Sequence, residues 1–242
     1  MLNVVYRICA TESPKRRPSF YSKVRCLKNF LMAVERVQDV HLVLISDGEP
    51  NPEWIEPLPA HAEVEVLKKC GNSASFIHAL STALRYPPAD LIYFVEDDYL
   101  HVPEALEKLL ECNHELQPDY LTLYDHPARY WGAEHPEVDL PLRSNFVRMT
   151  STHHWRAVES TCMTFAASTR ILRQDFQTIV DHVSPKAPQD RELFRHIQGL
   201  GKYSSHEPAR ILVGPVPSLA THCEEPWLAP VIDWAMLANS TP

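Results

Sequence analysis

Short apolar blocks alternate with helical patterns through the first half of the chain. Each block indicates a buried strand, and the segments between them carry apolar residues three and four positions apart, as on one face of a helix. The expected strands are 4–10, 40–49, 62–68, 91–95 and 119–125. The expected helices begin at Ser19 as N-cap, at Ser75, and at Pro103, a residue that a first turn tolerates. This alternation predicts an α/β fold with a mostly parallel central sheet flanked by helices.

The pattern changes after Asp125. A polar, aromatic and proline-rich stretch indicates a long loop, and the apolar runs beyond it suggest antiparallel strands. The expected elements are a loop at 126–141, strands at 146–160, 162–168 and 209–215, helices at 169–183 and 190–200, and an irregular tail at 221–242. We therefore expect one domain over 1–242, with a smaller antiparallel C-terminal part. Residues 1–125 would form the nucleotide-binding half, and 126–242 a second half that completes the site.

Composition narrows the class of partner. The 242 residues are 45% hydrophobic and 22% charged, as in an ordinary globular protein, and the net charge is −8. The densest basic run, Lys15-Arg16-Arg17, is too short to follow a phosphate backbone, so we expect no nucleic-acid partner. The six cysteines are scattered, no apolar run reaches the ~20 residues of a membrane span, and the start lacks a signal-peptide pattern. We expect a cytoplasmic protein without a membrane span.

Carboxylates follow several of the expected strands. The segment "LIYFVEDDYLH" runs from Leu91 to His101 and ends a strand on Glu96, Asp97 and Asp98. Asp47 and Asp125 also stand just after apolar runs. Because ligands bind beyond the carboxyl ends of strands in open parallel sheets, these acids are expected near one edge. Their repulsion favours a divalent cation with oxygen ligands, Mg²⁺ or Mn²⁺, although such acids are often only solvated loop residues or helix caps.

The ordered set of acids resembles the GT-A glycosyltransferases. "EDD" is similar to their DxD motif, with Glu96 in the first acidic place. The resemblance implies that Asp98 ligates the metal and that Glu96 and Asp97 contact the donor's sugar or ribose. The acid in "ISDGE", Asp47, takes the place that reads the nucleoside in that family.

Other segments extend the resemblance across most of the chain. "RICATESPKRRPSFYSK" is similar to the nucleotide-contacting loop, which implies donor contacts from Thr11 and Arg17, and "GNSASFIHALSTAL" places Asn72 in the segment before DxD. "PQDREL" resembles the xED motif and puts Asp190 in the place of the catalytic base of inverting members. "ATHCE" puts His222 where a histidine completes the metal site. Gln in place of Glu before Asp190 and the lack of a glycine-rich loop depart from the pattern.

The resemblance implies a metal-dependent, inverting glycosyltransferase. It would move a sugar from a nucleotide-diphosphate sugar, a UDP-sugar by family frequency, to a hydroxyl of a glycan or glycoconjugate, with Mn²⁺ or Mg²⁺. Two alternatives stay open. One is a sugar-phosphate nucleotidyltransferase, although the region "RICATESPKRRP" lacks that group's glycine-rich signature. The other is a catalytically silent module that binds nucleotide sugars.

Several of these residues have structural interpretations as well. Asp190 stands at a helix start, where it would favour the first turn by up to ~1 kcal/mol without any catalytic role. His222 is one of thirteen histidines, most of which are expected at the surface or in the core. Tryptophans can stack on sugar rings or simply fill the core. The candidates for a sugar platform are Trp131, Trp155, Trp227 and Trp234.

Overall fold

The structure is a computed structural model that describes residues 1–130, 146–184 and 188–241. Its strands are β1 (Leu2–Cys9), β2 (Val40–Asp47), β3 (Glu63–Leu67), β4 (Leu91–Glu96), β5 (Tyr99–His101), β6 (Tyr120–Leu121), β7 (Val147–Met149), β8 (His154–Ala157), β9 (Phe165–Ser168), β10 (Leu212–Val216) and β11 (Ala220–His222). Its α-helices are α1 (Lys23–Val34), α2 (Pro52–Ile55), α3 (Asn72–Ala83), α4 (Ala105–Glu115), α5 (Thr169–Gln174), α6 (Phe176–Val183), α7 (Asp190–Ile197) and α8 (Trp234–Asn239). Short 3₁₀ helices cover Pro127–Tyr130 and Gly201–Tyr203.

Nine of the described strands form one mixed sheet in the order β3-β2-β1-β4-β9-β6-β10-β8-β7. The first four in this order are all parallel, whereas β9, β8 and β7 pair in antiparallel fashion. A separate antiparallel pair joins β11 to β5. The predicted α/β class, with a mostly parallel central sheet and a smaller antiparallel part, is confirmed. Strands from both predicted halves of the chain enter the large sheet.

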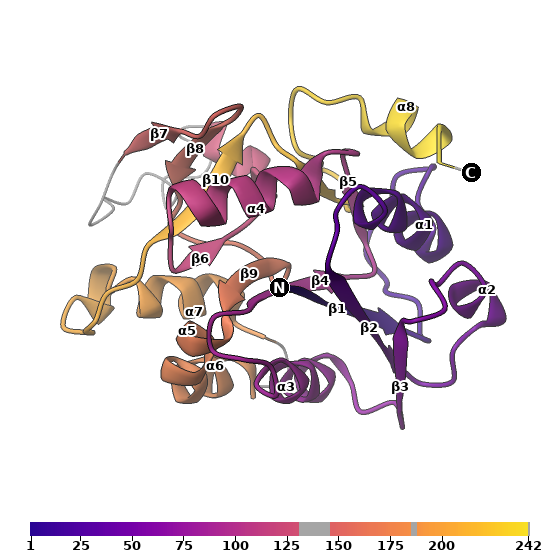
Figure 1. Cartoon of the computed structure of the whole chain (residues 1–242), viewed down its shortest axis with the longest axis horizontal. Coiled ribbons are helices and arrows are strands. Elements are labelled where there is room, and N and C mark those ends of the chain that lie inside the picture. Colours follow the sequence, from indigo (N-terminus) through magenta and orange to yellow (C-terminus); the bar gives the residue numbers. More distant parts are fainter. Residues whose placement is uncertain (131–145, 185–187, 242) are drawn as a thin grey trace.

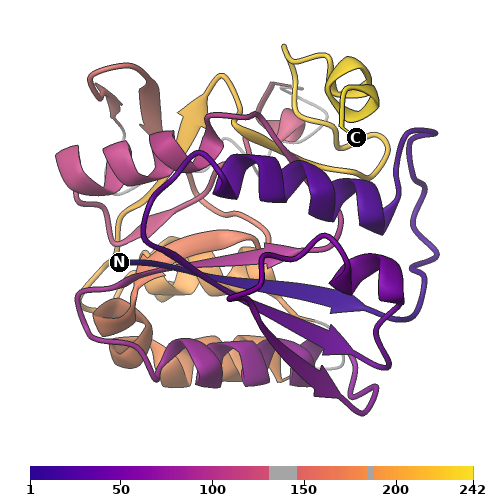
Figure 2. The same cartoon turned by 45° about the vertical axis from the view of Figure 1, so that its right-hand side comes forward.

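Helices cover both faces of this sheet. In Figure 1 and Figure 2, α1, α4 and α8 lie on one side and α3, α5, α6 and α7 lie on the other. The strands feed both layers because successive side chains point to opposite faces. Along β1, Val4 and Tyr6 pack in the cluster that contains α1 and α4, whereas Val5 packs in the cluster that contains α3. The continuously apolar strands of the sequence are therefore strands buried on both faces.

Local side-chain contacts explain where two of the predicted helix boundaries are wrong. The N-cap of α1 is Ser22 rather than Ser19, and its hydroxyl accepts a hydrogen bond from the N–H of Arg25 at 3.1 Å. The single helix expected over 169–183 is interrupted at Asp175, which separates α5 from α6. The carboxylate of Asp175 is buried and accepts hydrogen bonds from Nη2 and Nε of Arg210, the shortest at 2.7 and 2.9 Å, so a long-range ion pair holds the break.

The tail is more ordered than its sequence suggests. The segment expected to be irregular contains part of β11 and the whole of α8, whose N-cap Asp233 accepts a hydrogen bond from the N–H of Met236. The three residues of β5 begin directly after Asp98, and the sequence pattern did not predict this strand. Pairing of β11 with β5 brings the C-terminal segment back to the acidic triplet.

Candidate functional site

The parallel register brings the expected acids to one edge of the sheet. Cys9 at the end of β1 lies beside Asp47 at the end of β2, and Arg7 lies beside Glu96 at the end of β4. The carboxyl ends of three neighbouring strands therefore meet here, as the sequence analysis expected. Asp125 follows β6, which runs in the same direction as β4 but is separated from it by β9. Its buried carboxylate pairs with Arg156 at 2.6 Å, which gives it a structural role.

The three acids of "EDD" point to three different partners. Glu96 ends β4, but Asp97 and Asp98 form a turn before β5, so the triplet is not extended. Glu96 pairs with Arg7 at 3.0 Å. Asp97 accepts a hydrogen bond from the N–H of Cys9 at 2.8 Å and lies 3.4 Å from the ammonium of Lys23.

Asp98 lies deepest of the three and pairs with two groups. Its Oδ2 accepts a hydrogen bond from Arg17 at 2.9 Å and lies 3.0 Å from His222 Nε2, while only 6% of Asp98 is exposed. The protein thus supplies a basic partner for every carboxylate of the triplet. The sequence suggested that a metal neutralises these charges. In the structure, arginine, lysine and histidine side chains already neutralise them in part.

Burial and charge separate the pKa values of the triplet. Burial raises the pKa of Glu96 despite the nearby Arg7 guanidinium. Burial and the charge of Asp98 together raise the pKa of Asp97. Burial also opposes ionisation of Asp98, but His222 and Arg17 outweigh it and hold the pKa of Asp98 well below its usual range. Asp98 is therefore the member of the triplet that stays ionised most firmly.

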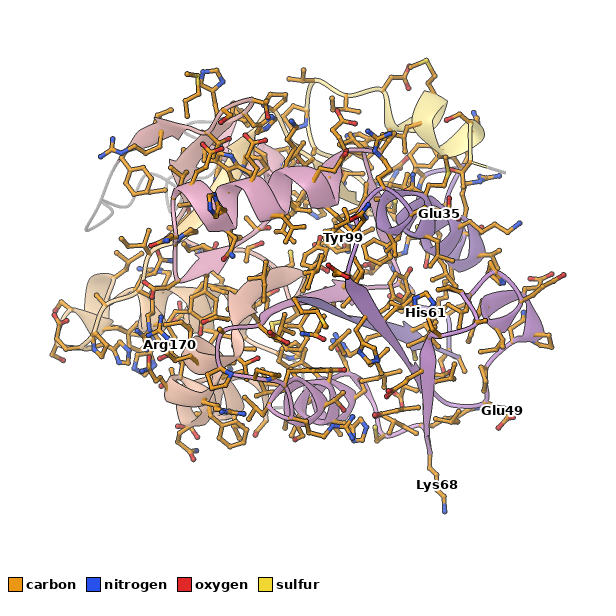
Figure 3. The ribbon with its side chains drawn as sticks, viewed as in Figure 1. Glu35, Glu49, His61, Lys68, Tyr99 and Arg170 are labelled. Carbon is orange, nitrogen blue, oxygen red and sulfur yellow. The ribbon has the colours of Figure 1, made fainter. Side chains whose placement is uncertain are left out.

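The second, two-stranded sheet places His222 at this edge. His222 pairs with Tyr99 across β11 and β5, and the N–H of Cys223 donates to the carbonyl of Asp98 at 2.7 Å. Tyr99, labelled in Figure 3, is fully buried, and its ring stacks on His222 with centroids 5.2 Å apart. A backbone ladder and a stacked ring thus hold the imidazole against Asp98. The expected proximity of Asp98 and His222, 124 residues apart, is observed.

A cavity of about 310 Å³ opens over the strand ends, and we call it the N-terminal pocket. It is lined by the residues expected to bind the donor and to ligate the metal through the DxD-like motif, together with several basic side chains. The expected residues among them are Thr11, Arg17, Asp47, Asn72, Glu96, Asp97 and Asp98. The basic ones are Arg7, Lys15, Arg17 and Lys23. The structure therefore collects all seven of these predicted side chains around one cavity.

Two of these residues also support the pocket wall. The carboxylate of Asp47 accepts hydrogen bonds from the N–H groups of Cys70 and Gly71, at 2.7 and 2.9 Å, and so fixes the loop before α3. Asn72, the first residue of α3, accepts a hydrogen bond from Arg7 on its side-chain oxygen at 2.8 Å. Thr11 is exposed in the loop after β1. Asp47 is thus already engaged by backbone donors in addition to facing the pocket.

A cavity of about 420 Å³ adjoins the first, and we call it the C-terminal pocket. Asp190, Arg191 and His222 line it, together with residues from the segments around Tyr124, Glu159 and Glu224. Among the residues that the structure describes, Lys15 is the one that lines both pockets. The two halves of the predicted site therefore meet at this lysine.

Asp190 lies both at the start of a helix and at the wall of a cavity. It is the first residue of α7, and its Oδ1 accepts a hydrogen bond from the N–H of Arg191 at 2.9 Å, a contact that favours the first helical turn. It also faces the C-terminal pocket. Desolvation raises the pKa of Asp190, and the backbone hydrogen bond and the charges of Lys15 and His222 only partly oppose this effect. A carboxylate with a raised pKa beside a cavity is chemically suited to accept a proton.

The four candidate tryptophans fall into different environments. Trp155 is fully buried, and its indole N–H donates to Thr150, so it belongs to the core. Trp234 is also buried, in α8. Trp227 lines the C-terminal pocket, with its ring 5.0 Å from that of His126. Trp131 lies outside the described residues. Trp227 is therefore the described tryptophan placed to contact a ligand.

The sequence pattern did not predict that three basic residues belong to the site. Arg7 interrupts an otherwise apolar strand, and a buried charge near a strand end was a usable signal for it. Lys23 is 6% exposed and donates to the carbonyls of Cys9 and Thr11, but nothing distinguishes it from a solvated residue in a helical turn. Lys15 was treated as part of a short basic run. Its contacts depend on the return of the C-terminal segment, which the sequence does not show.

The side chains of Asp98 and His222 offer atoms that a divalent metal could use as ligands. Within 1–130, 146–184 and 188–241, no group of three or more histidine, cysteine, aspartate or glutamate residues is arranged to hold a metal ion. However, the buried Oδ1 of Asp98 has no hydrogen-bond partner, and His222 offers Nε2 beside the other oxygen. Mg²⁺ commonly uses one or two protein ligands and completes its shell with phosphate oxygens and water. Asp98 and His222 therefore fit a metal that is bound together with a diphosphate.

Comparison with known proteins gives remote similarities only. No protein-family model matches the chain, and no curated protein matches it. A structure of residues 1–349 of S. aureus TarS shows 14% identity and a TM-score of 0.46, and the match covers 81% of this chain and 54% of that one. The same TarS segment in complex with UDP shows 13% identity and a TM-score of 0.45, covering 88% and 60% of the two chains.

A third similar structure is that of 4-diphosphocytidyl-2C-methyl-D-erythritol synthase. It shows 11% identity and a TM-score of 0.47, and the match covers 98% of this chain and 96% of that one. The present chain spans little more than half of the TarS structures. At these identities and TM-scores the likenesses assign no activity.

None of the described helices combines the length and apolarity needed to cross a membrane.

Proposed function

We propose that the protein is a glycosyltransferase that moves a sugar from a nucleotide-diphosphate sugar to a hydroxyl of a glycan or glycoconjugate. The observation that carries the proposal is the pair of adjoining pockets that meet at Lys15. The N-terminal pocket combines carboxylates at three strand ends with four basic side chains, a mixture suited to ribose hydroxyls and a diphosphate. The C-terminal pocket contributes Asp190, a carboxylate with a raised pKa.

In the proposed donor complex the basic residues hold the diphosphate. Arg17 donates to Asp98 and to the carbonyl of Cys223, so its guanidinium is fixed at the boundary between the two halves of the chain. A fixed guanidinium recognises phosphate oxygens with little loss of side-chain entropy. Thr11, Glu96 and Asp97 stand around the same cavity and are proposed to bind ribose and sugar hydroxyls, and Asp47 and Asn72 to bind the nucleoside end.

We further propose that Mn²⁺ or Mg²⁺ binds at Asp98 and His222 when the donor is present. The metal would supply positive charge for the departing diphosphate. The chain's own residues orient the reactants. Asp190 accepts the proton of the acceptor hydroxyl, and that oxygen then attacks the anomeric carbon from the side opposite the diphosphate, which inverts its configuration. Trp227 at the wall of the C-terminal pocket is proposed to contact the acceptor sugar.

The proposal is tested by donor binding and by product release. A panel of nucleotide sugars is screened for thermal stabilisation with and without Mn²⁺, beginning with UDP-sugars. A ligand at about 100 times its Kd should add about 2.7 kcal/mol to the free energy of unfolding. Donors that stabilise the protein are then incubated with glycan acceptors, and release of nucleoside diphosphate is followed. If no nucleotide sugar stabilises the protein under either condition, the proposed function is wrong.

One feature also favours a second candidate, a sugar-phosphate nucleotidyltransferase. The N-terminal pocket has four basic side chains, enough to accommodate a triphosphate as well as a diphosphate. The two reactions release different products. A glycosyltransferase consumes a nucleotide sugar and gives a nucleoside diphosphate, whereas a nucleotidyltransferase consumes a nucleoside triphosphate and a sugar phosphate and gives pyrophosphate. Assays for both products on one enzyme preparation separate the two functions.

A further inference from the structure

The ammonium of Lys15 lies at the junction of the two pockets. Its Nζ is 2.9 Å from Glu224 Oε2 and 3.4 Å from His222 Nε2. His222 Nε2 in turn lies 3.0 Å from Asp98 Oδ2 and 3.5 Å from Glu224 Oε2. His222 Nε2 thus lies within 3.5 Å of one oxygen of each of two carboxylates and of the lysine ammonium.

The surroundings favour a positive charge at this point. Burial lowers the pKa of Lys15, but Asp98 and Glu224 outweigh this effect and raise it, so the side chain is firmly protonated. Lys15 reaches the region from the loop after β1, and 42% of its side chain is exposed. A flexible, partly exposed lysine can leave without disturbing the core. The neighbouring Arg17 is more constrained, because it is 14% exposed and bonded to both Asp98 and Cys223.

From this geometry we propose that Lys15 is an exchangeable counter-ion, whose ammonium lies beside His222 and Glu224 and competes with a divalent metal for a position at His222 and the adjoining Asp98. The inference rests on the proposed function, because it concerns the metal of that same site. In the absence of the donor, the lysine neutralises the carboxylates and opposes metal entry. When metal and diphosphate arrive together, Lys15 moves away from His222 and Glu224 toward the added phosphate charge.

The exchange explains two observations together. The described residues contain no preformed three-ligand metal group, although His222 lies close to both Asp98 and Glu224. A cation among these groups is attracted to each of them and repels a second cation. Metal binding should therefore be weak in the free protein and stronger with a diphosphate, and removal of the lysine charge should strengthen it without any nucleotide.

The test measures Mn²⁺ affinity in the nucleotide-free protein by electron paramagnetic resonance of unbound Mn²⁺. The variants are Lys15→Met, which keeps the length of the stem, and Lys15→Gln, which keeps a polar end. Lys108→Met is the matched control, because it also removes one ammonium and one ion pair, with Glu111, but on α4. Circular dichroism checks that each variant is folded. Loss of a unit charge a few ångströms from a divalent ion should tighten Mn²⁺ binding by about tenfold or more.

Tighter binding in both Lys15 variants, with the Lys108 variant like the parent, supports the exchange. Equal or weaker binding in the Lys15 variants overturns it, and so does a lack of Mn²⁺ binding in every variant. Transfer from a nucleotide sugar in saturating Mn²⁺ is measured on the same preparations. If transfer occurs but Mn²⁺ affinity is unchanged, the exchange is wrong and the glycosyltransferase stands. If Mn²⁺ affinity rises but no donor binds or reacts, the exchange stands and the proposed function is wrong.

Discussion

Asp98 of the N-terminal pocket and Asp190 of the C-terminal pocket are held in opposite ways. In the N-terminal pocket Asp98 is buried between Arg17 and His222, and its pKa lies well below the usual range. In the C-terminal pocket Asp190 accepts a hydrogen bond from the N–H of Arg191, and desolvation raises its pKa. Both residues are aspartates at the edge of the same α/β fold. The difference therefore comes from which partners the fold supplies.

This contrast assigns different chemistry to the two carboxylates. A carboxylate that stays charged is suited to hold cations beside a diphosphate. A carboxylate whose pKa is raised accepts a proton more readily. Two carboxyl groups whose environments push their pKa values apart are a common arrangement for divided roles in catalysis. Each of the following substitutions acts mainly on one side of this contrast.

The largest expected effect is that of Asp190→Asn on transfer. Asparagine keeps the shape of the side chain and an oxygen for the N–H of Arg191, but it does not take up a proton at neutral pH. The rate of sugar transfer should fall by roughly 10²–10⁴-fold. The measurement is single-turnover transfer with saturating donor and Mn²⁺. Donor affinity should be close to that of the parent, because Asp190 lines the other pocket.

A rate within a few-fold of the parent would remove Asp190 from the mechanism. Its hydrogen bond to the N–H of Arg191 would then be its main role, and a retaining mechanism, which does not require a base at that place, would be favoured. Glu192→Gln is the matched control, because it neutralises another carboxylate of α7 whose partners are Lys202 and Tyr203. That variant should transfer sugar at nearly the parent rate.

The next effect is on stability, where Asp98→Ala should destabilise the protein much more than Asp190→Asn. Removal of one member of a buried ion pair leaves Arg17 and His222 without their shared partner, which should cost about 3 kcal/mol. Chemical denaturation at pH 7 in the presence of chelator measures the difference. Equal midpoints for the two variants would show that Asp98 is not held by its ion pairs as the structure indicates.

Low pH should change the effects of these two residues in opposite directions. The folded pKa of Asp98 is depressed, so its stabilising contribution is present above the unfolded value of about 3.9 and is lost as pH falls toward the folded pKa. The destabilisation caused by Asp98→Asn should therefore shrink by up to about 1.4 kcal/mol per pH unit below that value. Denaturation midpoints at several pH values, with chelator present, provide the comparison.

Asp190 should show the reverse trend. Its folded pKa is raised, so the ionised form is destabilising above the folded value, and this penalty disappears as pH falls below the unfolded value. Asp190→Asn should therefore gain stability relative to the parent at neutral pH and lose that gain in acid. Parallel pH dependences for the two variants would contradict the contrast between Asp98 and Asp190.

The sequence predicted those parts of the site that depend on local pattern. Apolar runs located β1, β2 and β4, and the rule for parallel sheets then placed Asp47 and Glu96 at one edge. The break at Asp175 was not predictable, because it depends on Arg210, which is 35 residues away. The turn at Asp97 and Asp98 was also missed, since it follows from the pairing of β5 with β11 and not from the triplet itself.

Pairing between distant residues limited the prediction of the C-terminal pocket. The family resemblance suggested that His222 approaches Asp98, but the ladder and ring stacking that hold it are visible only in the folded chain. Lys15 lies far from Glu224 in sequence, and no periodicity connects them. Among the tryptophans, local composition did not distinguish the buried Trp155 from Trp227 at the pocket, because burial is decided by neighbouring strands and segments.

The smallest expected effect concerns Trp227 and acceptor binding. Its ring lies beside His126 at the wall of the C-terminal pocket, where an aromatic face can pack on a sugar ring. Trp227→Ala should raise the KM for the acceptor by about tenfold, which corresponds to about 1.4 kcal/mol, and should leave donor affinity unchanged. Trp227→Phe keeps an aromatic face and should recover most of this loss. Steady-state transfer at saturating donor, with the acceptor varied, gives both values. If the alanine variant instead weakens donor binding, Trp227 acts on the N-terminal pocket, and the assignment of the two pockets to donor and acceptor is wrong.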